Sequence, residues 1–90
     1  MIKYEKGKVY AKNYGYSIVA YDFYRCIKAT DKSAWFQKLG KKWVSGDGQQ
    51  GFVVCTYEPD TYDTKPKCVR QGTFMGTEYL GEQLYEDHMD

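Results

Sequence analysis

The sequence is poor in the residues from which metal sites and disulfide frameworks are built. It contains one histidine, His88, and three widely spaced cysteines, Cys26, Cys55 and Cys68, with no Cys-x-x-Cys pair among them. A structural zinc site needs about four such ligands at recognisable spacing, and small secreted domains pair their cysteines in even numbers. We therefore expect no metal ion and no cofactor, and we interpret the three cysteines as small buried residues of a cytosolic protein.

Long apolar runs are also missing. No stretch approaches the roughly 18–20 consecutive apolar residues that a membrane-spanning helix needs. The opening residues, MIKYEKGKVY, do not contain the apolar segment of a secretory signal peptide. We therefore expect neither a membrane anchor nor secretion.

Patterns typical of enzymes are absent as well. Nucleophilic catalysis requires a Ser, Cys or Thr beside a positioned base, whereas the one histidine lies close to the end of the chain, where side chains are poorly held. The stretch SGDGQQG at residues 45–51 lacks the G-x-G-x-x-G and G-K-[ST] spacings of phosphate-binding loops. We predict that the protein is not an enzyme, has no catalytic residue and acts by binding.

Aromatic residues, by contrast, are abundant. The 90 residues include ten Tyr, four Phe and two Trp. Each large aromatic side chain can bury roughly 150–250 Å², so a short chain can build a core from few residues. The length is typical of one domain, and we expect a single β-rich domain over residues 1–90.

The near-zero net charge hides an asymmetry along the chain. Residues 1–50 carry nine Lys and one Arg against four acids, a balance of +6, while residues 51–90 carry three basic residues against eight acids, a balance of −5. Opposite charges in the two halves either attract a charged partner or neutralise one another in the fold.

The most informative stretch is YGYSIVAYDFYRCIKAT, at residues 14–30. Residues 18–30 contain seven β-branched or aromatic residues and no Gly or Pro, which predicts a strand. Alternation along a strand assigns one face to the core, comprising Tyr21, Phe23, Arg25, Ile27 and Ala29. The other face is expected to be partly exposed, and comprises Asp22, Tyr24, Cys26, Lys28 and Thr30.

Turn signals divide the rest of the chain into further short strands. We expect strands at residues 8–11, 34–39, 52–57 and 67–71, with turns at residues 13–16, 30–33 and 40–42 and loops at residues 45–51 and 60–66. Short strands at intervals of about ten residues favour a mainly β fold, either a small antiparallel sheet or an SH3-like barrel.

The C-terminal residues allow two interpretations. Glu78, Glu82, Glu86 and Asp90 recur every four residues, as on one face of a helix. Gly81 would cost such a helix about 1 kcal/mol, and like charges at this spacing repel. We therefore favour a hairpin of residues 77–80 and 83–87.

Several of these motifs together resemble a group of small proteins encoded by bacteriophages, prophages and plasmids. The resemblance is carried by YGY, by YDFYRCIKATDKSAWFQKL, by Lys67-Cys68-Val69-Arg70 and by the ending YLGEQLYEDH. It implies a mobile-element origin, a β-rich fold and a location in the cytoplasm of a bacterial host. It implies no catalytic residue.

Small proteins of mobile elements commonly act by occupying a functional surface of a host protein. Our leading hypothesis is a stoichiometric inhibitor of a host defence protein, anti-CRISPR-like in action, working as a monomer or homodimer. Exposed Tyr and Arg are favoured at protein contacts, and the candidates at the central strand are Tyr14, Tyr16, Asp22, Tyr24, Arg25 and Lys28. A second set of candidates could imitate the phosphates of nucleic acid, namely the acidic residues Glu82, Glu86 and Asp87.

The alternative hypothesis is a nucleic-acid-binding β-barrel module. Basic groups that contact phosphates and aromatic rings that stack on bases are the usual components of such surfaces. The residues that would supply them are Tyr16, Tyr24, Arg25, Lys28, Trp35, Lys38, Lys41 and Lys42.

Overall fold

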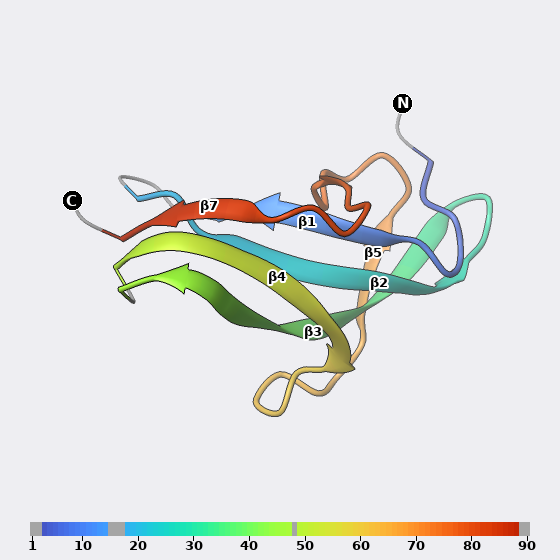
Figure 1. The fold of residues 1–90 in the computed structure, drawn as a ribbon. Coiled ribbons are helices and arrows are strands. Elements are labelled where there is room, and N and C mark those ends of the chain that lie inside the picture. The colour runs from blue at the N-terminus through green and yellow to red at the C-terminus, as the bar shows by residue number, and fades with distance from the viewer. Residues whose placement is uncertain (1–2, 15–17, 48, 89–90) are drawn as a thin grey trace.

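The computed structural model describes residues 3–14, 18–47 and 49–88, and these residues form one antiparallel sheet that curls into a half-barrel (Figure 1). The expectation of a small, mainly β, antiparallel fold is confirmed. The strands are β1 (Val9–Asn13), β2 (Tyr21–Ala29), β3 (Ser33–Gly46), β4 (Gln50–Pro59), β5 (Lys67–Arg70), β6 (Thr77–Glu78) and β7 (Leu84–Asp87).

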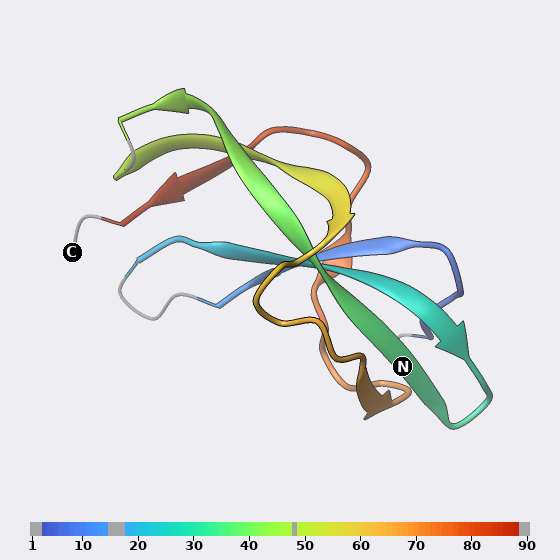
Figure 2. The same ribbon diagram turned by 90° about the horizontal axis from the view of Figure 1, so that it is seen from below.

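Strand β3 organises the sheet. The strand order is β6-β1-β2-β3-β4-β7, and β5 pairs with β3 off this path. Residues 33–36 of β3 pair with β5, and residues 39–46 pair with β4 (Figure 2). The long axis of the molecule is 42 Å. Because a strand rises about 3.3 Å per residue, the 14 residues of β3 reach from one end of the molecule to the other.

The curl brings the last strand back toward the start of β2. Val19 and Asp87 exchange two backbone hydrogen bonds, of 2.8 and 2.9 Å. This bridge joins β7, the last strand of the sheet, to the residues that lead into β2. The half-barrel is therefore held together at this end by main-chain contacts.

The sheet has a hydrophobic cluster on each face, because successive residues of a strand point to opposite sides. Inside the curl lie Val9, Ala11, Phe23, Leu39, Val53, Cys55 and Tyr79. On the opposite face lie Tyr4, Tyr10, Cys26, Ala34, Phe36 and Met75. In the second cluster the rings of Tyr4, Tyr10 and Phe36 meet edge to face at centroid distances of 4.8–5.9 Å.

A bulge in β2 corrects part of the predicted alternation. The pairing with β3 shifts between Cys26 and Lys28, so Ile27 is the extra residue. Phe23 is in the core as expected, but Ile27 is 37% exposed and Cys26 is fully buried. The alternation of side chains between the two faces of the sheet is interrupted by a bulge, because the inserted residue moves each following side chain to the opposite face.

The turn expected at residues 40–42 does not form, because β3 continues through Gly40. A Cβ at this position would lie 2.9 Å from Thr56 Oγ1 on β4, so glycine permits a close approach of the two strands. The register between β3 and β4 also shifts at this point, between Leu39 and Lys41. The glycine marks a crowded strand crossing instead of a chain reversal.

The expected C-terminal hairpin is also wrong, although both of its segments contain strands and neither is helical. β6 pairs with β1, and β7 pairs with β4. Gly76 and Gly81 have positive φ angles and redirect the chain between these partners. Separating the two segments buries Tyr79 against Phe23, whereas a local hairpin would leave that ring without the inner cluster to pack on.

Other expected features are present. Thr30 and Ser33 form the tight turn between β2 and β3, and the loop at residues 60–66 lies between β4 and β5. The loop expected at residues 45–51 is wrong in its bounds, because β3 runs to Gly46 and β4 begins at Gln50. Within the described part of the chain there is no helix with the length and apolar character needed to cross a membrane.

Candidate partner-binding surfaces

The residues predicted to form one recognition edge lie on opposite faces of the sheet. Tyr24 packs against the cluster of Tyr4 and Phe36, and Asp22 shares its face by alternation. Arg25 and Lys28 are paired with Gln37 and Trp35 on β3. Arg25 lies on the other face by alternation, and the bulge places Lys28 on that face as well. The candidates therefore define two separate surfaces.

The first surface, which we name the tyrosine face, consists of Asp22, Tyr24, Lys38, Tyr62 and Asp63. The Tyr24 hydroxyl donates to Asp22 Oδ2 at 3.4 Å, and Lys38 Nζ lies 3.7 Å from Asp22 Oδ1. Burial, together with the neighbouring carboxylate of Asp22, raises the pKa of Tyr24 to about 12. The Tyr24 phenol is therefore a protonated hydrogen-bond donor at neutral pH.

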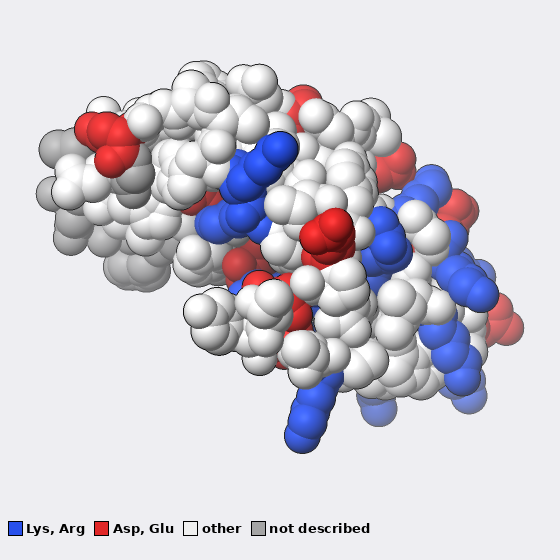
Figure 3. Space-filling model, turned by 60° about the horizontal axis from the view of Figure 1, so that its bottom comes forward, with Lys and Arg blue, Asp and Glu red and all other residues white. Residues whose placement is uncertain are grey.

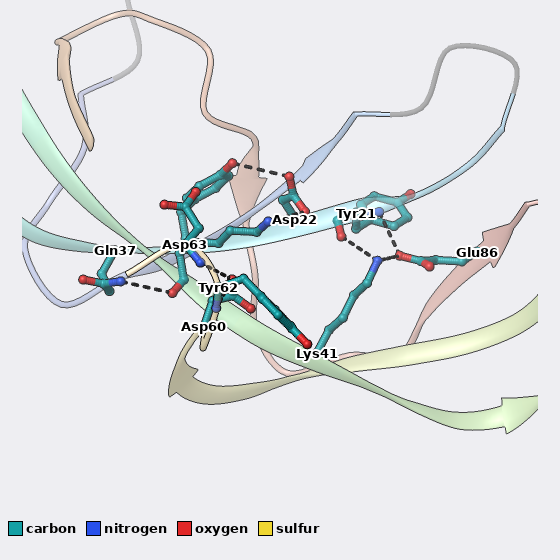
Figure 4. Close-up of polar contacts among 10 residues, drawn as sticks. Tyr21, Asp22, Gln37, Lys41, Asp60, Tyr62, Asp63 and Glu86 are labelled. Atoms are coloured by element: carbon teal, nitrogen blue, oxygen red, sulfur yellow. Dashed lines mark hydrogen bonds and ion pairs between the residues drawn. The ribbon is translucent and has the colours of Figure 1, made fainter. Parts of the chain in front are cut away.

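The loop at residues 60–66 is folded against this face (Figure 4). The backbone N–H of Asp60 donates to the Lys38 carbonyl at 2.9 Å, and the Asp60 carboxylate accepts from the N–H groups of Tyr62 and Asp63 at 3.3 and 2.8 Å. Tyr62 is 94% exposed on this hydrogen-bonded turn. A hollow of about 170 Å³ lies at the first residue of this loop and is lined in part by Asp22, Lys38 and Asp60.

Tyr62 and Asp63 were not among the residues predicted to bind a partner, and Lys38 was predicted to contact nucleic acid only. A usable signal was present, since an Asp after a proline commonly accepts hydrogen bonds from backbone groups two or three residues on. Such a turn holds its exposed side chains in a defined place. Only the fold, however, brings the turn beside Asp22 and Tyr24, from which it is separated by more than thirty residues.

The second surface, which we name the tryptophan face, consists of Arg25, Lys28, Trp35, Tyr57 and Arg70. Lys28 Nζ lies 4.7 Å from the centroid of the Trp35 ring, and an Arg25 guanidinium nitrogen donates to the Tyr57 carbonyl at 3.3 Å. Trp35 is partly buried. Lys and Arg side chains gather at the end of the molecule that carries the β2–β3 turn (Figure 3).

Glu86 corrects the prediction of an exposed acidic surface. Its side chain is fully buried inside the curl, where its carboxylate accepts from Lys41 Nζ at 2.5 Å and from the Tyr21 N–H at 2.8 Å, and lies 2.7 Å from His88 Nε2. Burial alone would raise the pKa of this carboxyl, but the hydrogen bonds from Lys41, His88 and Tyr21 outweigh it and hold the pKa below 4.5. Glu86 is therefore a structural residue and is not available to a partner.

The two remaining acidic candidates are separated as well. Glu82 is exposed in the turn before β7, where its carboxylate accepts from the Leu80 N–H at 2.9 Å. Asp87 is partly buried on β7 and lies 3.5 Å from the Gln50 side-chain amide. Glu86, which lies between them in the sequence, is buried. The three acids therefore do not form one continuous charged surface.

Tyr14 follows β1, and its backbone N–H donates to the Ala20 carbonyl at 3.0 Å. Its ring is half-exposed, and its centroid lies 5.6 Å from Lys41 Nζ, the cation that pairs with Glu86. Tyr16, the other tyrosine of the predicted turn, lies outside the described residues.

Two of the three cysteines are buried. Cys26 and Cys55 are buried, and burial raises the pKa of both thiols, so they stay protonated at neutral pH. Cys68 is exposed, contrary to the expectation that all three cysteines are buried. Across residues 3–14, 18–47 and 49–88, no three His, Cys, Asp or Glu side chains gather closely enough to hold a metal ion.

Comparison of the chain with known protein families, curated proteins and solved structures finds no significant match.

Proposed function

We propose that the protein acts by binding a host protein through the tyrosine face, as a stoichiometric inhibitor of a defence nuclease such as a CRISPR effector. The observation that carries this proposal is Tyr62. A 94% exposed tyrosine on a turn fixed by three hydrogen bonds offers a partner a large contact area at little cost in conformational entropy. Tyr and Arg are the side chains most enriched at protein hot spots.

The surroundings of Tyr62 favour a protein over a nucleic acid as the partner of this face. Asp22, Lys38 and Asp63 present both signs of charge within one small area. A polyanion would be repelled by the two carboxylates, whereas a protein surface can match mixed charges with its own. Because Asp60 already holds the turn, binding would cost little ordering of the loop.

The inhibitory role rests on the resemblance to proteins of mobile elements. A protein of this size has room for a contact surface of several hundred square ångströms, which is typical of one side of a standard interface. Blocking a functional surface of an enzyme needs no chemistry from the inhibitor. The proposed action is therefore equimolar occupation, with neither turnover nor a cofactor.

The first experiment measures inhibition directly. Bacteria with an active CRISPR effector that express this protein should lose interference against a targeted plasmid, and the purified protein should block target cleavage by the purified effector. Inhibition should reach completion near equimolar protein, because each effector is occupied by one copy. Inhibition at strongly substoichiometric amounts would instead indicate catalysis, and full cleavage at excess protein by every effector class tested would reject this target.

The Tyr62→Ala variant locates the contact. We expect roughly a thirtyfold weaker inhibition, corresponding to about 2 kcal/mol for a hot-spot tyrosine, with an unchanged melting temperature because the ring is exposed. The matched control is Tyr85→Ala, which removes a half-exposed tyrosine from the distant strand β7. Equal effects of the two substitutions would contradict assignment of the contact to the tyrosine face.

A further inference from the structure

The tryptophan face is a platform made by three strands. In register, Lys28 of β2 and Cys68 of β5 flank Trp35 of β3, while Arg70 of β5 is opposite Ser33. Because Ala34 and Phe36 point into the cluster on the other side, Trp35 points outward from this platform. An indole ring therefore lies in the middle of a three-stranded surface.

The Trp35 ring already holds a cation. The Lys28 ammonium lies 4.7 Å from the ring centroid, within the range of a cation–π contact. Lys28 is exposed, so its flexible side chain can leave the ring without breaking a buried contact. A planar base can then stack on the indole in place of the ammonium, and the freed ammonium can reach the phosphate attached to that base.

A second aromatic residue, Tyr57, is joined to Arg25 of this face through its carbonyl and has a strained backbone. Tyr57 is the one non-glycine residue with positive φ, at 62°, among those that the structure describes. A bulky residue in this region costs about 1–2 kcal/mol. Its ring is 43% exposed and its carbonyl accepts from Arg25 at 3.3 Å. Strain of this kind persists where the resulting side-chain position is useful.

Basic groups surround the two rings. Arg25 lies next to Tyr57, Lys28 covers Trp35, and Lys32 and Arg70 line a shallow hollow of about 570 Å³ at the end of the platform. This hollow has the size of a small-molecule site. The acid that also lines it, Asp31, is paired with Lys3 at 3.6 Å.

We propose that the tryptophan face binds single-stranded nucleic acid. Bases stack on Trp35 and Tyr57, and phosphates contact Arg25, Lys28 and Arg70. Stacking rings that alternate with cations are the common components of surfaces that bind single strands with little sequence preference. A duplex keeps its base faces covered by stacking and cannot use the rings in this way. The proposal is independent of protein binding at the tyrosine face.

The experiment titrates the intact protein into a fluorescein-labelled oligothymidylate of about 15 nucleotides, a length sufficient for a small stacking platform, and follows anisotropy. In a Trp43→Phe background, Trp35 is the one remaining tryptophan, and its fluorescence should be quenched as bases stack on it. Binding should weaken with salt at a slope of roughly −2 in log K against log salt, about −0.7 for each of three phosphate contacts.

Two variants and a matched control decide the assignment. Lys28→Glu with Arg70→Glu should weaken binding at least about tenfold, whereas Lys12→Glu with Lys65→Glu, which changes the net charge equally, should change it less than about twofold. Tyr57→Gly should weaken binding by roughly tenfold while the fold remains intact, because glycine relieves the positive φ.

Several outcomes would overturn the proposal. Binding of the oligothymidylate could be undetectable at low salt, or a duplex of the same length or an oligoglutamate peptide could bind equally tightly. The fluorescence of Trp35 could remain unquenched. The platform and control variants could also lose the same amount of affinity. Equal binding of the peptide would identify a general anion-attracting surface, of the kind that an acidic protein segment would use.

Discussion

Tyr57 has a backbone φ angle that is unusual for a bulky residue. Its φ of 62° places it where glycine is at ease and a bulky side chain is not. Three contacts keep it there: the Arg25 guanidinium on its carbonyl, the Cys55 sulfur as acceptor for its N–H, and the Tyr79 ring at 6.1 Å. The surrounding structure determines this conformation against the local preference of the chain.

We expect Tyr57→Gly to be more stable than Tyr57→Ala by about 1 kcal/mol. Both substitutions remove the ring, and only glycine also removes the backbone strain, so their difference isolates the strain. The measurement is urea unfolding followed by circular dichroism. Equal stabilities of the two variants would mean that φ relaxes to the ordinary region once the ring is gone.

Glu86 links a single residue to the pH range of stability. Its folded-state pKa is lowered below the ordinary value of 4.5. A group with a lowered folded-state pKa stabilises the protein at pH above its unfolded value, and this contribution is lost as the pH falls through the folded-state pKa. The carboxylate should therefore stabilise the fold fully above pH 4.5 and progressively less below it.

The corresponding variant is Glu86→Gln. At neutral pH we expect it to be less stable by about 3 kcal/mol, because the partly buried Lys41 ammonium loses its carboxylate partner. Urea unfolding at a series of pH values should show the wild-type protein and the variant converging below pH 4.5. A difference that stays constant down to acid pH would contradict the assigned role of the carboxylate.

At the level of elements, β3 determines how the strands are arranged. Its first part pairs with β5 and contributes to the cluster of Tyr4 and Phe36, and its second part pairs with β4 on the other side of Gly40. Leu39, beside Gly40, belongs to the cluster inside the curl. Continuity through Gly40 is what allows one strand to serve two clusters. A turn at this glycine would have produced two short strands and a different pairing for β4.

The crossing at Gly40 can be tested with a double-mutant cycle. Gly40→Ala should destabilise the protein by about 1–2 kcal/mol, because the added Cβ would lie 2.9 Å from Thr56 Oγ1. Thr56→Ala removes that oxygen, so the double variant should recover about 1 kcal/mol relative to the sum of the single effects. Chemical unfolding of the four proteins measures the coupling, and strict additivity would show that the strands are not in contact there.

At the level of the whole molecule, the two oppositely charged halves of the chain neutralise one another in part. Lys8 pairs with Glu78 at 3.3 Å and Lys41 with Glu86 at 2.5 Å, and both pairs join a cation of the first half to an acid of the second. Many of the other Lys and Arg side chains gather at the end with the β2–β3 turn (Figure 3). The charge pattern therefore contributes both to the fold and to a basic surface.

The sequence by itself determined the β character of the chain, the hairpin of β2 and β3, and Phe23 as a core residue. These features follow from local rules, namely β-branched and aromatic content, a polar turn at residues 30–33 and the absence of Gly and Pro between residues 18 and 30. Local rules hold where neighbouring residues decide the conformation.

The tertiary structure decided the features that depend on distant partners. Gly40 is part of a strand because β3 and β4 approach closely there, and Cys26 is buried because a second cluster covers its face of the sheet. Glu86 lies in the interior, where it pairs with Lys41. The folding of the sheet likewise brings the turn at Asp60 close to Asp22 and Tyr24. Each outcome depends on a contact between residues far apart in the chain, and no local pattern encodes such a contact.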